Sequence, residues 1–271
     1  MTQGVTKKKG GKPGKKLAVF AGVHGDERAG VFALEKLIKN IEPEAGEVYF
    51  VYANPEAIER DVRYTEKNLN RCFLKEAGVE NYEERRAKEL MPILDECDAL
   101  LDLHASNNKE ATPFIICGED CRDIVGIFDF DIVSFDWDDI EPGATDGYMY
   151  NQGKPGICLE CGSLHQSEEN ADLAYVSALR FLEYFGAVKN EAGEYNKRPQ
   201  RSVQVVRAVK KKTEDFGFVK DFADFKKLTP GEVFAWDGEE KYVAGEDECI
   251  IFPDSDQKIG DEVFVLGRFV R

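Results

Sequence analysis

An apolar run at residues 17–23 is followed at once by His24-Gly-Asp-Glu27, and a second apolar run at residues 99–103 ends in His104. If the first run is a buried strand and a helix begins near residue 26 or 28, His24 and Glu27 lie in the turn at the carboxyl end of that strand. Open α/β sheets place their ligand crevices at this end of the strands. His104 would reach the same edge from a neighbouring strand. The sequence therefore predicts an α/β sheet with polar side chains gathered at one edge.

Two imidazoles and one carboxylate are the ligand set of many catalytic zinc sites, in which a fourth position stays open for water. Gly22 and Gly25 allow the backbone to bend tightly between the strand and the helix. By itself an H-x-x-E motif is a weak signal, and a single histidine is more often a hydrogen-bonded core residue. The position of both segments after strand candidates favours one zinc ion on His24, Glu27 and His104, and hence a hydrolase.

Polar residues with matching roles follow a third strand candidate at residues 48–53. Arg63 and Arg71 are candidates for two tasks, because arginine binds a carboxylate through two hydrogen bonds and a fixed cation near a metal stabilises an oxyanion. Asn70, beside Arg71, would fix the orientation of the substrate. For any one of these arginines alone, a surface ion pair is the simpler interpretation.

Glu160 interrupts the apolar run at residues 156–162. A carboxylate in such a run is costly to bury unless it is paired or used. Facing a zinc-bound water, it would accept a proton and later return it to the leaving nitrogen. An edge-strand glutamate that is partly exposed is the alternative.

Together these segments resemble the aspartoacylase and succinylglutamate desuccinylase family, which is related to the zinc carboxypeptidases. The resemblance covers residues 17–187, and its motifs are H24-G-D-E27, N54-P, R63-Y, N68-L-N70-R71-C-F, D102-L-H104 and L159-E160-C-G. It implies zinc on the two histidines and Glu27, and Glu160 as the general base. It also implies that Arg63 stabilises the oxyanion, while Asn70 and Arg71 hold a substrate carboxylate.

The chain departs from the family pattern in two places. Asn68 stands where the family usually has an aspartate that supports the first zinc histidine, and an amide oxygen would accept the same hydrogen bond with less charge. The arginine with which aspartoacylase binds its substrate's side-chain carboxylate is also missing. Its place falls near Tyr150, with Lys154 close by. N-acetylaspartate is therefore not the expected substrate.

Composition agrees with a cytoplasmic enzyme of 271 residues that has no apolar run long enough for a membrane span. The net charge of −16 argues against nucleic acid and anionic membranes as partners. Residues 1–16 contain six lysines and no acidic residue, which predicts a disordered tail. The seven cysteines indicate a reducing compartment, and Cys158 and Cys161 would face opposite sides of a strand, which disfavours a cysteine metal site.

Periodicity predicts three amphipathic helices. One follows His24 and Glu27, one precedes His104, and one follows Glu160. Their apolar faces are Val31-Leu34-Ile38, Ala87-Leu90-Met91-Leu94, in which Pro92 predicts a kink or an early end, and Ala174-Ala178-Phe181-Leu182-Phe185. Strand and helix patterns alternate from residue 17 to residue 185, which predicts helices on the faces of a sheet. The resemblance implies that this sheet is mixed, as in the zinc carboxypeptidases.

Composition changes after Gly186. A polar linker at residues 190–201 is expected to lead into a small β domain, with short runs at residues 203–209, 232–236, 241–244, 249–252 and 262–270. The predicted organisation is thus a tail at residues 1–16, a catalytic domain at 17–190, and a linker with a β domain at 191–271.

Three functions stay open at this point. The favoured one is a zinc-dependent deacylase of a small carboxylate-bearing N-acyl amino acid. A zinc carboxypeptidase uses the same ligands and needs a wider entrance, and a binding protein without catalysis is suggested only by Asn68. His165 is either a substrate contact or a loop histidine, and the sequence does not name the acyl group, the amine or the oligomeric state.

Overall fold

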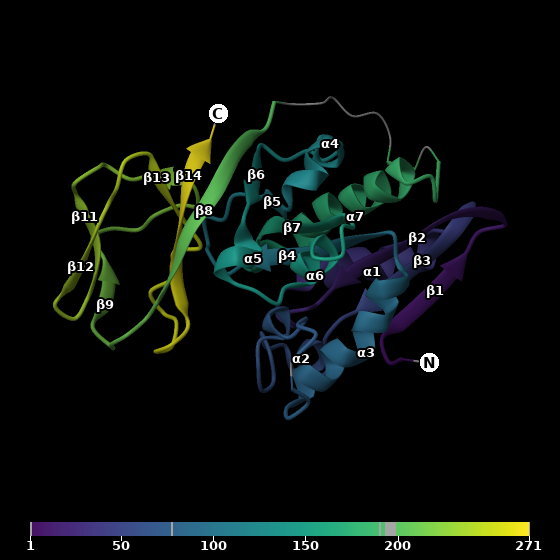
Figure 1. The fold of residues 1–271 in the computed structure, drawn as a ribbon, viewed down its shortest axis with the longest axis horizontal. Coiled ribbons are helices and arrows are strands. Elements are labelled where there is room, and N and C mark those ends of the chain that lie inside the picture. Colours follow the sequence, from purple (N-terminus) through teal and green to yellow (C-terminus); the bar gives the residue numbers. More distant parts are fainter. Residues whose placement is uncertain (1, 77, 190, 193–198, 271) are drawn as a thin grey trace.

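The computed structural model describes residues 2–76, 78–189, 191–192 and 199–270. One sheet of eleven strands extends through the molecule in the order β1-β3-β2-β4-β7-β5-β6-β8-β14-β13-β10 (Figure 1). Strands β3, β2, β4 and β7 are parallel neighbours, whereas β5 pairs antiparallel with β7. The prediction of a mixed α/β sheet is therefore confirmed.

The strands of the main sheet have the following bounds. They are β1 Val5–Lys9, β2 Lys12–Ala21, β3 Ala45–Tyr52, β4 Ala99–Ser106, β5 Phe114–Cys117, β6 Ile132–Phe135, β7 Gly156–Ser163, β8 Arg201–Lys210, β10 Lys226–Lys227, β13 Glu248–Ile251 and β14 Glu262–Val270. A second sheet contains β9 Phe216–Phe218, β11 Val233–Asp237 and β12 Glu240–Val243. The helices are α1 Arg28–Asn40, α2 Pro55–Arg60, α3 Tyr82–Glu96, α4 Arg122–Val125, α5 Trp137–Ile140, α6 Thr145–Tyr150 and α7 Ser167–Tyr184, with short 3-10 turns at Leu69–Arg71, Glu119–Cys121 and Leu164–Gln166.

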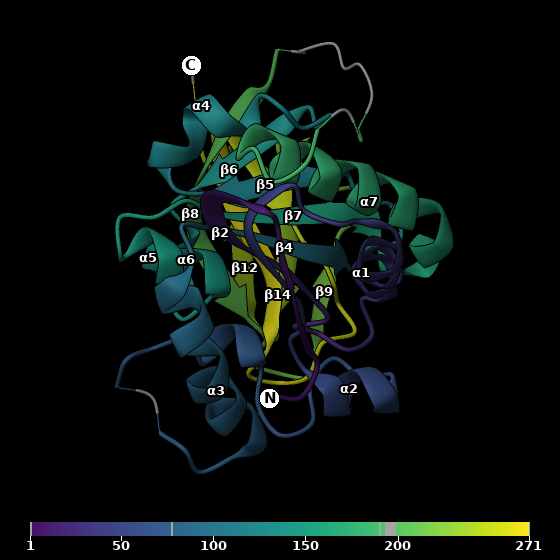
Figure 2. The ribbon, with the colours of Figure 1, turned by 90° about the vertical axis from the view of Figure 1, so that its right-hand side faces the viewer.

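Both faces of the central strands are covered, so successive residues of β2 enter different cores. Leu17, Val19 and Ala21 pack with α1 and α7, while Ala18 and Phe20 pack with α3 and α6. This is the two-residue period of a strand buried on both sides, which explains why the run reads as continuously apolar. Figure 2 shows α7 and α1 together on one side of the central strands and α3 away from them.

All three predicted helices are present as α1, α3 and α7. In α3 the predicted apolar residues Ala87, Leu90, Met91 and Leu94 are all buried. The expected early end at Pro92 is wrong, because α3 continues to Glu96. Pro92 lies on the exposed side of the helix, where water can hydrogen-bond the carbonyl groups that its ring leaves without an amide donor.

The lysine-rich segment at residues 1–16 differs from the expected disordered tail. Most of it forms β1 and the first half of β2, and β1 pairs antiparallel with β3. The ammonium groups of Lys7 and Lys9 lie 2.8 and 3.3 Å from different carboxylate oxygens of Glu47. Backbone pairing and these acidic partners order a segment that has little apolar surface of its own.

The C-terminal part contains the predicted β domain. Five predicted runs correspond to β8, β11, β12, β13 and β14, and their aromatic side chains pack into a separate core around Phe234 and Phe264. Part of the predicted linker, residues 193–198, lies outside the described residues. β8 and β14 join the domain to the main sheet, since β8 pairs with both β6 and β14 (Figure 1). Among the described helices, none combines the length and the apolar character needed to cross a bilayer.

Candidate metal centre and active-site cavity

The turn after β2 positions His24 and Glu27. Gly22 starts the turn with a φ of +67°, a value that residues with a side chain rarely adopt. At Gly25, a Cβ atom would lie 2.1 Å from the carbonyl carbon of Ala57, so only glycine allows the turn to pack this closely against α2. The Gly25 amide also donates to the Arg63 carbonyl, 3.2 Å away. Both predicted glycines are thus needed to place the ligand pair.

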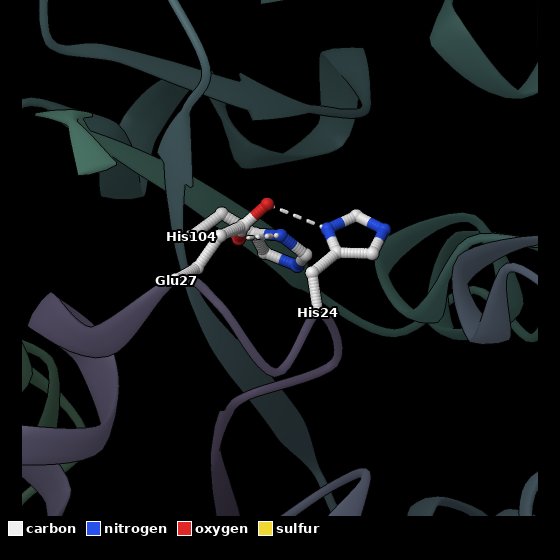
Figure 3. Close-up of side chains that lie close together, drawn as sticks. All are labelled: His24, Glu27 and His104. Atoms are coloured by element: carbon white, nitrogen blue, oxygen red, sulfur yellow. Dashed lines mark hydrogen bonds and ion pairs between the residues drawn. The ribbon is translucent and has the colours of Figure 1, made fainter. Parts of the chain in front are cut away.

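The three predicted ligands converge at the carboxyl ends of β2 and β4 (Figure 3). Nδ1 of His24 lies 2.6 Å from one carboxylate oxygen of Glu27, and Nδ1 of His104 lies 2.9 Å from the other. All three residues are buried. A donor atom from each lies within 4.8 Å of the other two.

This donor set fits a divalent cation. Two imidazole nitrogens and a carboxylate oxygen, brought together by different segments, are the ligands that zinc takes in catalytic sites. Burial and, to a smaller extent, the charge of Arg63 lower the pKa of His24 to about 4. The ring is therefore neutral, as a metal ligand must be. Burial favours neutral Glu27, but His24 and His104 outweigh it and hold the pKa of Glu27 well below its usual range.

A second layer of residues orients the two rings. The Nε2 atom of His24 lies 2.9 Å from Oδ1 of Asn68, as expected for an amide in place of an aspartate. The Nε2 atom of His104 lies 3.1 Å from Oδ2 of the fully buried Asp102, although the two are not aligned for a hydrogen bond. The hydroxyl of Thr145 donates to the same Asp102 oxygen. Burial opposes a charge on His104, but Asp102 and Glu27 outweigh it and raise the pKa of His104 well above its usual value.

Glu160 lies on β7 directly opposite His104 of β4. Only 8% of its surface is exposed, and its Oε2 atom has no hydrogen-bond partner among the described residues. Burial, followed by the nearby charge of Glu27, raises the pKa of Glu160 to about 8. Glu160 thus lies beside the candidate metal ligands, is buried and has a raised pKa. These are the properties of a general base.

The three remaining predicted residues lie in the segment before α3. Nη1 of Arg63 donates to Glu27 at 3.1 Å. Arg71 donates through Nε to Glu141 and through Nη1 to the Asn70 carbonyl at 2.7 Å, so Nη2 makes neither contact. The side-chain oxygen of Asn70 accepts from the Thr145 amide at 3.2 Å.

All seven predicted site residues line one cavity of about 1080 Å³. One wall comes from the C-terminal part, including Arg207, Phe252 and Glu262. Three other residues considered from the sequence do not line it: His165 is exposed on a turn, Tyr150 is 46% exposed, and Lys154 donates to the Asp95 carbonyl at 2.7 Å.

The cysteines agree with a structural role, since all seven are free and buried. Cys158 and Cys161 belong to different core clusters, as strand geometry predicts. The Cys158 side chain does line the cavity, and its sulfur lies close enough to donor atoms of His104 and Glu160 to form a second possible ligand group.

Several polar residues of the site received no role from the sequence. Asp102 could have been found, because residues 102 and 104 of a strand share a face. Glu141 and Asp146 follow no recognisable strand, and Glu262 comes from the other domain. Only the folded chain brings them to the cavity.

Fold and site together define an α/β protein with a buried His–Glu–His metal-type centre at the carboxyl edge of its sheet. Residues 13–181 match the succinylglutamate desuccinylase/aspartoacylase catalytic domain, and residues 202–266 match the AstE/AspA barrel-sandwich hybrid domain. The chain belongs to the succinylglutamate desuccinylase/aspartoacylase family.

Individual relatives are distant. The chain is 28% identical to a probable aspartoacylase of Nostoc over 58% of each protein, so it spans little more than half of that relative. It is 27% identical to the succinylglutamate desuccinylase of Vibrio cholerae serotype O1, over 93% of this chain and 80% of the relative. The crystal structure of a succinylglutamate desuccinylase from Vibrio cholerae has the same fold, with a TM-score of 0.81 at 23% identity over 99% of this chain and 86% of that one.

Proposed function

We propose that the protein is a zinc-dependent amide hydrolase that removes the acyl group from a small N-acyl amino acid. The observation that carries this proposal is the placement of Glu160 opposite His104, beside the three converging donors His24, Glu27 and His104. Relatives of comparable length are named for deacylation of amino acids, namely succinylglutamate desuccinylase and, in Xenopus tropicalis, aspartoacylase.

Glu160 is the proposed base. A zinc ion on His24, Glu27 and His104 supplies a Lewis acid that polarises the amide carbonyl and acidifies water. Glu160 takes the proton of the attacking water and passes it to the nitrogen that leaves with the amino acid. Its burial and its lack of a donor partner leave the carboxylate available for both transfers.

Arg63 and Arg71 are the proposed anion-binding groups. Arg63 already donates to Glu27, and its partly exposed guanidinium would face the carbonyl oxygen as negative charge develops there. Asn70 and Nη2 of Arg71, which takes no part in the bonds to Glu141 and the Asn70 carbonyl, would hold the carboxylate of the substrate and so fix the scissile carbonyl over the centre.

A small substrate is favoured over a peptide. Relatives of comparable length are named for small acyl amino acids, and parts of β8 and of residues 252–262 line the cavity together with the candidate ligands. The carboxypeptidase alternative requires an entrance wide enough for a peptide, which the screen below tests. We also keep the predicted domain boundary near residue 190 as a proposal.

The test is a hydrolysis screen on protein of verified zinc content, with N-acyl amino acids against a library of short peptides. We expect turnover of N-acyl amino acids, and a loss of about 10²–10⁴-fold in kcat for Glu160→Gln with zinc content unchanged. Glu169→Gln on the exposed side of α7 is the matched control and should keep full activity. Activity retained by Glu160→Gln would show that the base assignment is wrong, and preferred cleavage of peptides would favour the carboxypeptidase.

A further inference from the structure

Asp146 is a buried carboxylate that the proposed reaction does not use. It lies in α6, lines the active-site cavity, and is 8% exposed. The backbone amides of Asp146 and Gly147 donate to its carboxylate, but among the described residues no side chain donates a hydrogen bond to it and no lysine or arginine lies within ion-pair distance. A carboxylate buried in a cavity without a cation is costly, which makes it a candidate for binding a ligand.

The surroundings of Asp146 are acidic. Burial raises the pKa of Asp146 to about 7, and Asp102 adds to the increase as the nearest like charge. His104, one of the proposed zinc ligands, opposes this increase. Among the described residues, no lysine or arginine is placed to form an ion pair with Asp146.

Contacts of residues 145 and 146 relate Asp146 to the groups proposed to bind the amine half of the substrate. Its neighbour Thr145 donates to the side chain of Asn70, which is proposed to hold the substrate carboxylate. On the other side, the backbone of Asp146 packs against Gly156, which lies on the same face of β7 as Cys158 and Glu160. A side chain on the released amino acid would thus extend between Asn70 and Glu160, toward Asp146.

The same cavity is unsuited to an acidic side chain. Tyr150 and Lys154, which stand near the place of the missing family arginine, do not line the cavity. Acidic side chains outnumber basic ones around the cavity, and Arg63 and Arg71 are already paired with Glu27 and Glu141. The other basic residues that line it belong to the C-terminal part: Arg207, Lys210 and Lys258. Repulsion by Asp146 would oppose a second carboxylate on the substrate.

We propose that Asp146 binds a cationic group on the amine half of the substrate, so that the protein hydrolyses N-acyl derivatives of amino acids with an ammonium side chain. This inference rests on the proposed function. An ammonium group would donate directly to the carboxylate and would supply the positive charge that Asp146 lacks.

The test compares three substrates of similar length, the Nα-acetyl derivatives of ornithine, norvaline and glutamate. We expect kcat/KM to fall at least tenfold from ornithine to norvaline, and further to glutamate. Asp146→Asn should reduce the ratio of ornithine to norvaline at least tenfold. Asp139→Asn, which removes an acid from the exposed rim of the same cavity, should change that ratio less than twofold.

Calorimetry of the free amino acids with the wild-type protein gives a readout that needs neither turnover nor a variant. Ornithine should bind at least tenfold more tightly than norvaline, and this result decides the question if Asp146→Asn fails to fold. Hydrolysis that favours norvaline or glutamate would overturn the inference and leave the proposed function standing. Tight binding of ornithine by a zinc-loaded protein that cleaves no amide would overturn the function and support the inference.

Discussion

Asn68→Asp is expected to tighten zinc binding, because it gives His24 the charged partner that the family pattern contains. The His24 Nε2 to Asn68 Oδ1 distance of 2.9 Å is that of a hydrogen bond, so the exchange alters the charge of the acceptor and leaves its position unchanged. Hydrogen bonds to neutral groups contribute about 0.5–1.5 kcal/mol and those to charged groups about 1.5–3 kcal/mol. The difference of about 1–1.5 kcal/mol corresponds to a Kd for zinc that is lower by about tenfold.

The assay is competition with a chromogenic zinc chelator at pH 8, where the His24 ring, with a pKa of about 4, is neutral. The exchange also retains the bond from the Asn70 amide to Oδ1 of residue 68, so the local turn should not change. Asn107→Asp is the matched control, since Asn107 lines the same cavity and, among the described residues, no hydrogen bond joins it to either ring. If Asn68→Asp binds zinc no more tightly than the wild type, or if Asn107→Asp tightens binding equally, the role assigned to Asn68 is wrong.

Two further predictions concern the scaffold. Glu83 is fully buried and accepts hydrogen bonds from the Thr65 amide and hydroxyl at 2.7 and 2.8 Å and from the Lys67 amide at 3.1 Å, so Glu83→Gln should lower the free energy of unfolding by about 2–3 kcal/mol in urea titrations. These bonds outweigh burial and lower the pKa of Glu83. The contribution of Glu83 to the free energy of unfolding should therefore be complete above pH 4.5, its ordinary pKa, and should shrink as the pH falls below that value. A difference in stability between wild type and variant that grows toward low pH would contradict this. Deletion of residues 1–11 should lower the melting temperature and increase self-association in light scattering, because it removes β1 and exposes the edge of β3, whereas an unchanged melting temperature would mean that β1 contributes no stability.

Local sequence patterns predicted the central fold well. The runs that became β2, β3, β4 and β7 are apolar on both faces, and the helical faces of α1, α3 and α7 repeat over several turns. Strands β5 and β6 were not predicted, because each has four residues and is stabilised by pairing with strands distant in the sequence. β1 was missed for a related reason, since lysines form a strand there only because β3 and Glu47 lie beside them.

The candidate site shows the same division. His24, Glu27, His104 and Glu160 follow or interrupt apolar runs, and strand geometry is sufficient to place them at one edge. The acids that surround them come from loops, from a short helix and from the second domain, where no periodicity marks a position. Asp146 is an example, because its proposed role depends on its burial without a cationic side chain beside it. The sequence alone does not show which side chains lie next to it.

Charged groups in the cavity fall into two sets. The groups proposed to bind anions are each held by an acid, since Arg63 donates to Glu27 and Arg71 to Glu141. Glu160 and Asp146, proposed to receive a proton and a cation, have no ion-pair partner among the described residues. An arginine held by an acid is oriented before the substrate arrives, whereas a carboxylate kept from pairing retains its capacity to accept. The substrate would then interact with the unpaired acids Glu160 and Asp146, and the ion pairs of Arg63 and Arg71 would stay intact.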